Sequence, residues 1–341
     1  MSERDSAAPI RVVFCGTPAF AVPALRALAG DPRFVVALVV TQPDRPAGRG
    51  RKLVGPAVKA AALELGLAVH QPERLRSEAE REPLIAADAD VFVVAAYGVI
   101  FGPKTLAIPR AGCLNLHASL LPAYRGASPI SAAIAAREAM TGVTLMRMER
   151  GLDTGPMLGE RSVAIDPGDT TASLTDRLAE VAAELAVDLI PAVVAGDIDP
   201  VEQTGPASLT RPLVKWDGWL DWAQPAVELE AHVRAMWPWP RAWTTVGGPA
   251  GTGWMLQVHR ASVAEDVVRS DLAPGTVVAA HGELVVATGS GGLRFDAVQA
   301  PGGRPARGAA LLNASQLQAG DRLGHESMPF NLPPLVIPVD D

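Results

Sequence analysis

Short apolar runs alternate with longer segments rich in Ala, Leu and Glu over the first 200 residues of the chain. The apolar runs lie at residues 10–15, 34–40, 91–96, 113–117 and 143–148. Such runs are typical of buried strands in a parallel sheet. Helical patterns lie between them at residues 20–29, 56–65, 77–87 and 129–137, and a long one at 173–194 closes the unit. This alternation predicts an α/β fold with a doubly wound, mostly parallel sheet.

A linker-like stretch at residues 195–210 separates this unit from a different pattern. It contains two Gly, two Pro and several polar residues, a composition typical of a connecting segment. All seven Trp residues follow it, between Trp216 and Trp254. After a helical pattern at 226–236, β-like runs at 242–246, 254–259, 275–278, 284–288 and 293–298 predict a small β-barrel or sandwich. We therefore expect two domains, residues 1–205 and 206–330, and a loose tail over residues 327–341.

The overall composition narrows the class of protein. The chain has 341 residues, and its 48% hydrophobic and 20% charged residues argue against a disordered chain. Its 37 acidic and 30 basic residues leave a net charge of −7, which argues against a generally basic nucleic-acid binder but leaves room for a local basic patch. No apolar stretch reaches ~18 residues, and the polar N-terminus has no signal region. We therefore expect a cytoplasmic protein that does not bind membranes.

The sequence also argues against a metal, NAD or ATP. Cys15 and Cys113 are too few for a disulfide framework or a cysteine metal cluster, and the six His residues lack the spacing of metal ligands. The first strand ends in Gly16-Thr17-Pro18-Ala19-Phe20, which is neither the GxGxxG fingerprint of dinucleotide sites nor a GxxxxGK[ST] phosphate loop. We therefore expect a Rossmann-like sheet without these groups.

Three polar residues follow two of the expected strands at the edge where such sheets bind ligands. Asn115 and His117 are two residues apart, so their side chains point to the same face of a strand. Asp153 lies in a Gly-bounded turn after the next strand and is expected to reach the same crevice. Each residue alone would be interpreted as a turn, cap or structural hydrogen-bonding residue. Their matching positions favour a site.

An Asn, a His and an Asp together suit acyl transfer. The Asn amide can donate to a developing oxyanion, and the His can donate to the same oxygen or move a proton. The Asp favours the charged imidazole and orients its ring. Ser119 has no base aligned with it, so direct transfer to an external nucleophile is favoured over a covalent enzyme intermediate.

Two motifs resemble those of the folate-dependent formyltransferase family. They are Asn-x-His-x-Ser-Leu-Leu-Pro-x-x-Arg-Gly over residues 115–126 and Gly-Leu-Asp-Thr-Gly over residues 151–155. The resemblance implies catalytic roles for Asn115, His117 and Asp153 and 10-formyltetrahydrofolate as the co-substrate. It also implies that the folate pocket is framed by the segment after His117, namely Ser119, Leu120, Leu121 and Pro122. Arg125 either holds a carboxylate or the end of a tRNA, or braces the loop.

A basic segment selects among the members of this family. Residues 42–52 resemble a loop inserted in the members that formylate methionyl-tRNA, and they carry four basic residues and one acidic residue. That charge suits phosphate contacts. The resemblance implies that the loop binds the acceptor arm of the tRNA through Arg45, Arg49, Arg51 and Lys52. The β-rich second domain fits as well, because these members carry a C-terminal barrel resembling an OB-fold.

The expected activity is formyl transfer from 10-formyltetrahydrofolate to the α-amine of methionine on initiator Met-tRNA, by a catalytic domain that acts as a monomer. A formyltransferase for a sugar nucleotide or another small amine is the closest alternative, against which the basic loop and the second domain argue. An oxidoreductase would use the same sheet but needs the missing fingerprint. A noncatalytic RNA-binding protein would leave Asn115, His117 and Asp153 unexplained.

Overall fold

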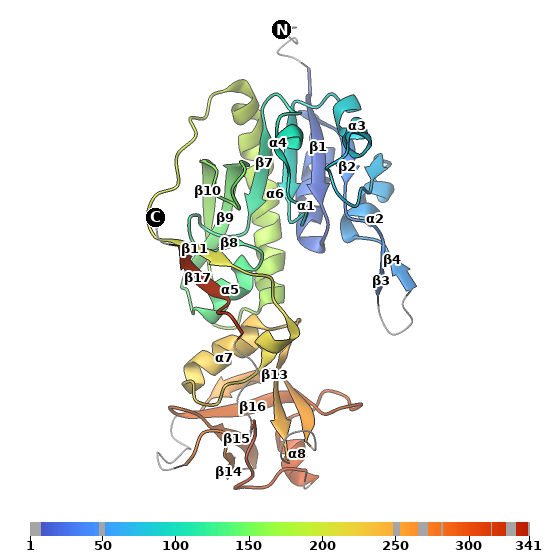
Figure 1. Ribbon diagram of the computed structural model, residues 1–341. Helices are drawn as coiled ribbons and strands as arrows, with labels where there is room; N and C mark the ends of the chain where they lie inside the picture. The colour runs from blue at the N-terminus through green and yellow to red at the C-terminus, as the bar shows by residue number, and fades with distance from the viewer. Residues whose placement is uncertain are drawn as a thin grey trace.

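Two β-sheet units form the body of the protein (Figure 1). The structure is a computed structural model that describes residues 8–47, 52–247, 253–264, 272–280, 282–314, 316–324 and 332–339. The first unit lies in the upper part of Figure 1, and the antiparallel strands of the second unit lie below it. No helix in these ranges is long and apolar enough to cross a membrane.

The N-terminal unit is built on a seven-stranded sheet in the order β10-β9-β7-β6-β1-β2-β5. Its parallel strands are β1 (Ile10–Gly16), β2 (Phe34–Val40), β5 (Val69–His70), β6 (Val91–Ala95) and β7 (Cys113–His117). Antiparallel strands β9 (Met140–Arg147) and β10 (Met157–Ala164) extend one edge. The prediction of a mostly parallel sheet is confirmed.

Helices cover both faces of this sheet, as a doubly wound fold requires. In β1, Val12 and Phe14 belong to one hydrophobic core while Val13 and Cys15 belong to another, because successive side chains point to opposite faces. The helices that pack into the first core are α1 (Val22–Gly30), which follows a short 3-10 turn (Ala19–Ala21), α2 (Ala57–Glu64), α5 (Pro129–Ala135) and α6 (Thr171–Ala195). The second core involves α3 (Glu78–Ala86) and α4 (Pro103–Leu106).

The C-terminal unit is a five-stranded antiparallel sheet in the order β12-β13-β16-β15-β14. Its strands are β12 (Ala242–Val246), β13 (Trp254–Val263), β14 (Val277–Ala280), β15 (Glu283–Ala287) and β16 (Gly292–Gln299). A 3-10 turn (Lys215–Gly218) and α7 (Ala226–Ala235) precede the sheet, and α8 (Ala309–Asn313) follows it. The predicted β-rich second part is confirmed, while its OB-like closure stays a prediction.

A third, small sheet brings the end of the chain back to the N-terminal unit. Strand β11 (Ala207–Thr210) pairs antiparallel with β17 (Val336–Val339) and parallel with β8 (Arg125–Gly126). The prediction of a loose tail is therefore wrong for residues 336–339. The tail carries Pro at four of its positions and has no periodicity, so no local pattern predicts this strand, which pairs with the edge that β11 offers.

A two-stranded hairpin projects from the N-terminal unit beside α2 (Figure 1). Strands β3 (Arg45–Ala47) and β4 (Lys52–Val54) pair antiparallel within the basic segment. The Asp44 carboxylate anchors its base, because it accepts hydrogen bonds from Lys59 Nζ at 2.7 Å and from Gln71 Nε2 at 2.7 Å. These hydrogen bonds, from Gln71 first and Lys59 second, lower the pKa of the Asp44 carboxyl.

Candidate active site

Asn115 and His117 lie on one face at the carboxyl end of β7. Strand alternation puts both side chains on the sheet face that carries Cys113, α3 and α4. The His117 side chain is almost fully buried, at 6% exposure, and the facing Asp153 side chain is 14% exposed. The structure thus brings together the three residues that the sequence predicted to share a crevice.

The Asp153 carboxylate is the meeting point of three donors. Asn115 Nδ2 donates to its Oδ1 at 3.2 Å, and the Gly126 backbone N–H donates to its Oδ2 at 2.8 Å. His117 Nδ1 lies 3.5 Å from Oδ2. The carboxylate therefore orients an amide and an imidazole at once.

Both ring nitrogens of His117 face oxygen acceptors. Nε2 lies 2.9 Å from the backbone carbonyl oxygen of Tyr124, while Nδ1 faces the Asp153 carboxylate. A neutral imidazole has one N–H, so only the protonated ring donates to both acceptors. The geometry therefore suits a cationic His117 beside a carboxylate.

Gly151 and Gly155 allow the loop that carries Asp153 to fold tightly. A Cβ at Gly155 would lie 2.0 Å from the Arg147 carbonyl oxygen, and one at Gly151 would lie 1.9 Å from Thr154 Oγ1. Asp153 itself adopts φ 53°, a left-handed conformation that non-glycine residues seldom adopt. The close approach of the loop to β9 thus explains Gly155, and the close approach of Thr154 within the loop explains Gly151.

The linker supplies a residue that sequence reasoning missed. Gln203 Nε2 donates to the carbonyl oxygens of Asp153 at 2.8 Å and of Gly155 at 2.7 Å. Its Oε1 accepts from Arg125 Nε at 3.0 Å and Nη2 at 2.8 Å. A Gln among Gly and Pro gives no local signal of these contacts. Arg125 thus braces the loop through Gln203, and its role toward a carboxylate or the tRNA end stays a prediction.

The segment predicted to frame a folate pocket is held by internal hydrogen bonds. Ser119 is fully buried, and its Oγ donates to the Ala123 carbonyl oxygen at 2.6 Å. The Leu121 N–H donates to Thr144 Oγ1, and the Leu121-Pro122 peptide bond is cis. Leu120 packs against Gly142 of β9. The roles of Ser119, Leu120, Leu121 and Pro122 toward a ligand stay predictions.

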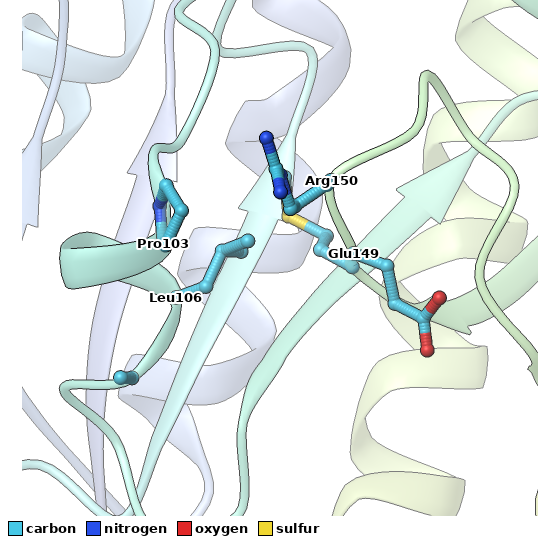
Figure 2. A pocket seen from close by; sticks show the side chains of 6 residues that line it. Pro103, Leu106, Glu149 and Arg150 are labelled. Carbon is cyan, nitrogen blue, oxygen red and sulfur yellow. The ribbon is translucent and has the colours of Figure 1, made fainter.

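A hollow of about 490 Å³ lies on the sheet face that carries Asn115. Figure 2 shows Pro103 and Leu106 on one side of it, and Glu149 and Arg150 on the other. Ala107 and Met148 complete its lining. Its Met148 N–H is bonded to the Cys113 carbonyl at the amino end of β7, and Arg150 precedes Asp153 by three residues.

The basic residues predicted to contact RNA are distributed along the hairpin. Arg45 is exposed on β3, where its Nη2 donates to Gln42 Oε1 at 3.2 Å. Arg49 and Arg51 lie outside the described residues, and Lys52 begins β4. In Figure 1 the hairpin lies beyond α2, on the opposite side of β1 from β7, the strand that carries Asn115 and His117.

Comparisons with known proteins agree along nearly the whole chain. The sequence profile described as "Formyl transferase" matches residues 10–190, and the one described as "Formyl transferase, C-terminal domain" matches residues 212–316. A methionyl-tRNA formyltransferase of Methylococcus capsulatus is 46% identical over 318 residues, which cover 92% of this chain and 100% of the relative. One of Burkholderia ambifaria is 47% identical over 325 residues, or 92% of this chain and 97% of the relative.

Solved structures share the fold at low sequence identity. The N-formyltransferase of Helicobacter canadensis, solved with folinic acid and dTDP-3-aminofucose, superposes with a TM-score of 0.60 at 14% identity, covering 84% of this chain and 98% of that one. HypX of Aquifex aeolicus, solved with tetrahydrofolic acid, gives a TM-score of 0.58 at 16% identity, covering 89% of this chain and 47% of that one. The two profiles and the relatives at 46–47% identity show that this chain belongs to the formyl transferase family, alongside the methionyl-tRNA formyltransferases.

Proposed function

We propose that the protein transfers a formyl group from 10-formyltetrahydrofolate to the α-amine of methionine on initiator Met-tRNA, which supplies formylmethionyl-tRNA for translation initiation. The observation that carries this proposal is the cluster of Asn115, His117 and Asp153 in a chain that is 46% identical to a methionyl-tRNA formyltransferase over 318 residues. The N-formyltransferase solved with dTDP-3-aminofucose resembles this chain in fold at only 14% identity.

The cluster supports acyl transfer without an enzyme nucleophile. When the neutral amine attacks the formyl carbon, negative charge develops on the formyl oxygen. Asn115 keeps one amide N–H on Asp153 and has a second N–H for that oxygen. The charged ring of His117 stabilises that negative charge while its Nδ1 stays turned toward Asp153 Oδ2, and the Asp153 carboxylate stabilises the ring and accepts the proton that the amine loses. The proton that Asp153 took from the amine then passes to N10 of the folate, the bond from the formyl carbon to N10 breaks as the carbonyl re-forms, and N10 leaves protonated.

The hollow beside α4 supports a site for the folate. Its volume of about 490 Å³ lies within the range of small-molecule sites, roughly 300–1,000 Å³. Pro103, Leu106 and Met148 offer apolar surface to a ring system, and the Arg150 guanidinium offers a partner for a carboxylate. We propose that the formyl group of the donor lies at Asn115 and His117, at the end of β7 from which Ser119–Pro122 continue, and that the rest of the donor extends toward this hollow.

The hairpin supports tRNA as the carrier of the amine. Residues 42–52 have four basic side chains and one acidic one, Asp44, whose charge Lys59 compensates. We propose that Arg45, Arg49, Arg51 and Lys52 contact phosphates of the acceptor arm. We further propose that residues 1–205 form the catalytic domain and 206–330 the accessory domain. All three site side chains come from one chain, which suits a monomer acting in the cytoplasm, where tRNA is charged.

The decisive experiment is transfer of labelled formyl from 10-formyltetrahydrofolate to initiator Met-tRNA by the wild type and by His117→Ala. We expect product with the wild type and a rate lower by about 10²–10³-fold with the variant. A parallel reaction supplies a dTDP-amino sugar in place of the tRNA. Faster transfer to the sugar than to Met-tRNA would contradict the proposed substrate.

A further inference from the structure

All the hydrogen-bonding capacity of the Gln203 amide is directed at the Asp153 loop and Arg125. An amide has two N–H donors and one oxygen with two lone pairs. The donors meet the carbonyl oxygens of Asp153 and Gly155, and the oxygen meets two nitrogens of one guanidinium. Glu would lack both donors, and Met would lack donors and acceptor. The position thus demands an amide.

These contacts bracket the residue that orients the catalytic cluster. The left-handed backbone of Asp153, at φ 53°, is costly for a non-glycine residue and persists only when its surroundings hold it. Gln203 Nε2 donates hydrogen bonds to the backbone carbonyl oxygens of Asp153 and Gly155. It fixes the direction in which the Asp153 side chain leaves the loop.

The residue after the other partner of Gln203 donates to the same carboxylate. Arg125 is followed by Gly126, whose N–H donates to Asp153 Oδ2 at 2.8 Å. The Arg125 carbonyl accepts from the buried Thr210 Oγ1 at 2.9 Å, and Gly126 pairs with Thr210 in the small sheet. The segment from Gln203 to Thr210 therefore fixes Asp153 both through its backbone and through its carboxylate.

We propose that Gln203, with Arg125, is a positioning residue of the transfer reaction: it sets the Asp153 carboxylate so that Asn115 and His117 face the formyl oxygen. This inference rests on the proposed function. It also gives Arg125 the role of holding the Gln203 amide in place, because its guanidinium nitrogens Nε and Nη2 both donate to Gln203 Oε1. Gln203 itself touches no reacting atom.

The test compares Gln203→Glu and Gln203→Met with Glu202→Ala, an exposed neighbour of Gln203. Gln203→Glu keeps an acceptor for Arg125 but turns a carboxylate toward two carbonyls, and Gln203→Met removes both sets of contacts. We expect kcat to fall about 10- to 100-fold in both variants, since small misplacements near the reacting atoms cost that much. The KM values for folate and Met-tRNA should change little, and Glu202→Ala should match the wild type. A wild-type kcat in Gln203→Glu together with a reduced kcat in Gln203→Met would assign the effect to Arg125 alone. It would refute the positioning of Asp153 by the two carbonyl contacts of Gln203.

A second readout follows the Asp153 carboxylate without any substrate. The Gly126 N–H is protected by Asp153 Oδ2, so its hydrogen exchange reports where that carboxylate lies. We expect faster exchange at Gly126 in both Gln203 variants and not in Glu202→Ala. If the wild type formylates no Met-tRNA, the proposed function fails, while hydrogen exchange at Gly126 still tests whether Gln203 positions the Asp153 carboxylate.

A purely structural role predicts a different pattern. Both variants would then melt at lower temperature with kcat within about twofold of the wild type, and this outcome would overturn the inference. Arg125→Lys is the second variant, in case Gln203→Met does not fold. It keeps the charge but loses the paired contact to Gln203 Oε1, and the same loss of kcat at constant KM is expected. An unchanged kcat in a folded Arg125→Lys would count against the pair.

Discussion

Replacing Asn115 with Ala removes a donor that serves both the reaction and the fold. One N–H of the amide bonds Asp153 Oδ1 at 3.2 Å, and the other is the proposed donor to the formyl oxygen. Loss of one such donor costs about 2.7–4 kcal/mol of transition-state stabilisation in other enzymes, or roughly 10²–10³ in rate. We expect a loss of that size in kcat, because the Asp153 carboxylate keeps its bond from Gly126 and continues to face His117.

The cost to stability is smaller. A hydrogen bond to a charged group contributes about 1.5–3 kcal/mol, and the length of this one, 3.2 Å, places it at the weak end. The melting temperature should therefore fall by only a few degrees, about 2–4 °C for each kcal/mol.

The assay is single-turnover formylation of Met-tRNA at saturating folate, measured with a thermal melt of each variant. Asn313→Ala, at the exposed end of α8, is the matched control and should behave as the wild type. Asn115→Asp keeps the shape but turns an oxygen toward the Asp153 carboxylate, so its rate should fall at least as far as that of Asn115→Ala. Near-normal turnover in a folded Asn115→Ala protein would refute the oxyanion role.

Three further changes test the surroundings of the site. Gly155→Ala places a Cβ 2.0 Å from the Arg147 carbonyl, so we expect a loss of about 1–3 kcal/mol in unfolding free energy and a slower transfer, measured by denaturant titration and rate. Ending the chain after residue 331 removes β17 and its four pairs with β11, so the melting temperature should drop by several degrees; an unchanged melt would show that the pairing contributes nothing. Arg45→Glu should raise the KM for Met-tRNA, flatten its salt dependence by about one unit of log–log slope or more, and leave folate binding intact, whereas a matching loss of folate binding would mislocate the residue.

Periodicity predicted the elements whose hydrophobic pattern is local. The apolar runs at 34–40, 113–117 and 242–246 coincide with β2, β7 and β12. The strand at 143–148 was predicted three residues late, because β9 starts with the exposed Met140, the buried but polar Thr141 and Gly142, before the apolar run begins. The absence of a GxGxxG fingerprint argued against a dinucleotide site and did not affect the prediction of the sheet. The sheet follows from the alternation of side chains along the strands, which builds a core on each face.

The parts that the sequence did not reveal depend on partners far along the chain. Gln203 contacts the Asp153 carbonyl 50 residues away and Arg125 78 residues away. Strand β17 is recognisable only through β11. Helix α4 has four residues, too short for a periodic signal, and it forms one wall of the hollow. The surface beside α4 therefore gave no signal in the sequence, and the folate pocket framed by Ser119–Pro122 stays a prediction from the family motif.

The charge of the chain reconciles an acidic protein with an RNA substrate. Residues 42–59 carry five basic side chains and one acidic one, so the rest of the chain is more acidic than the net charge of −7 suggests. The single acidic residue, Asp44, is engaged by Lys59 and Gln71, and its lowered pKa keeps it ionised at neutral pH. Its contribution to anchoring the hairpin is lost only as the pH falls through that lowered pKa. The proposed phosphate contacts therefore concentrate on the hairpin, and we expect the acidic remainder of the surface to repel RNA, so that binding is confined to a small, salt-sensitive footprint and the formylated product is released.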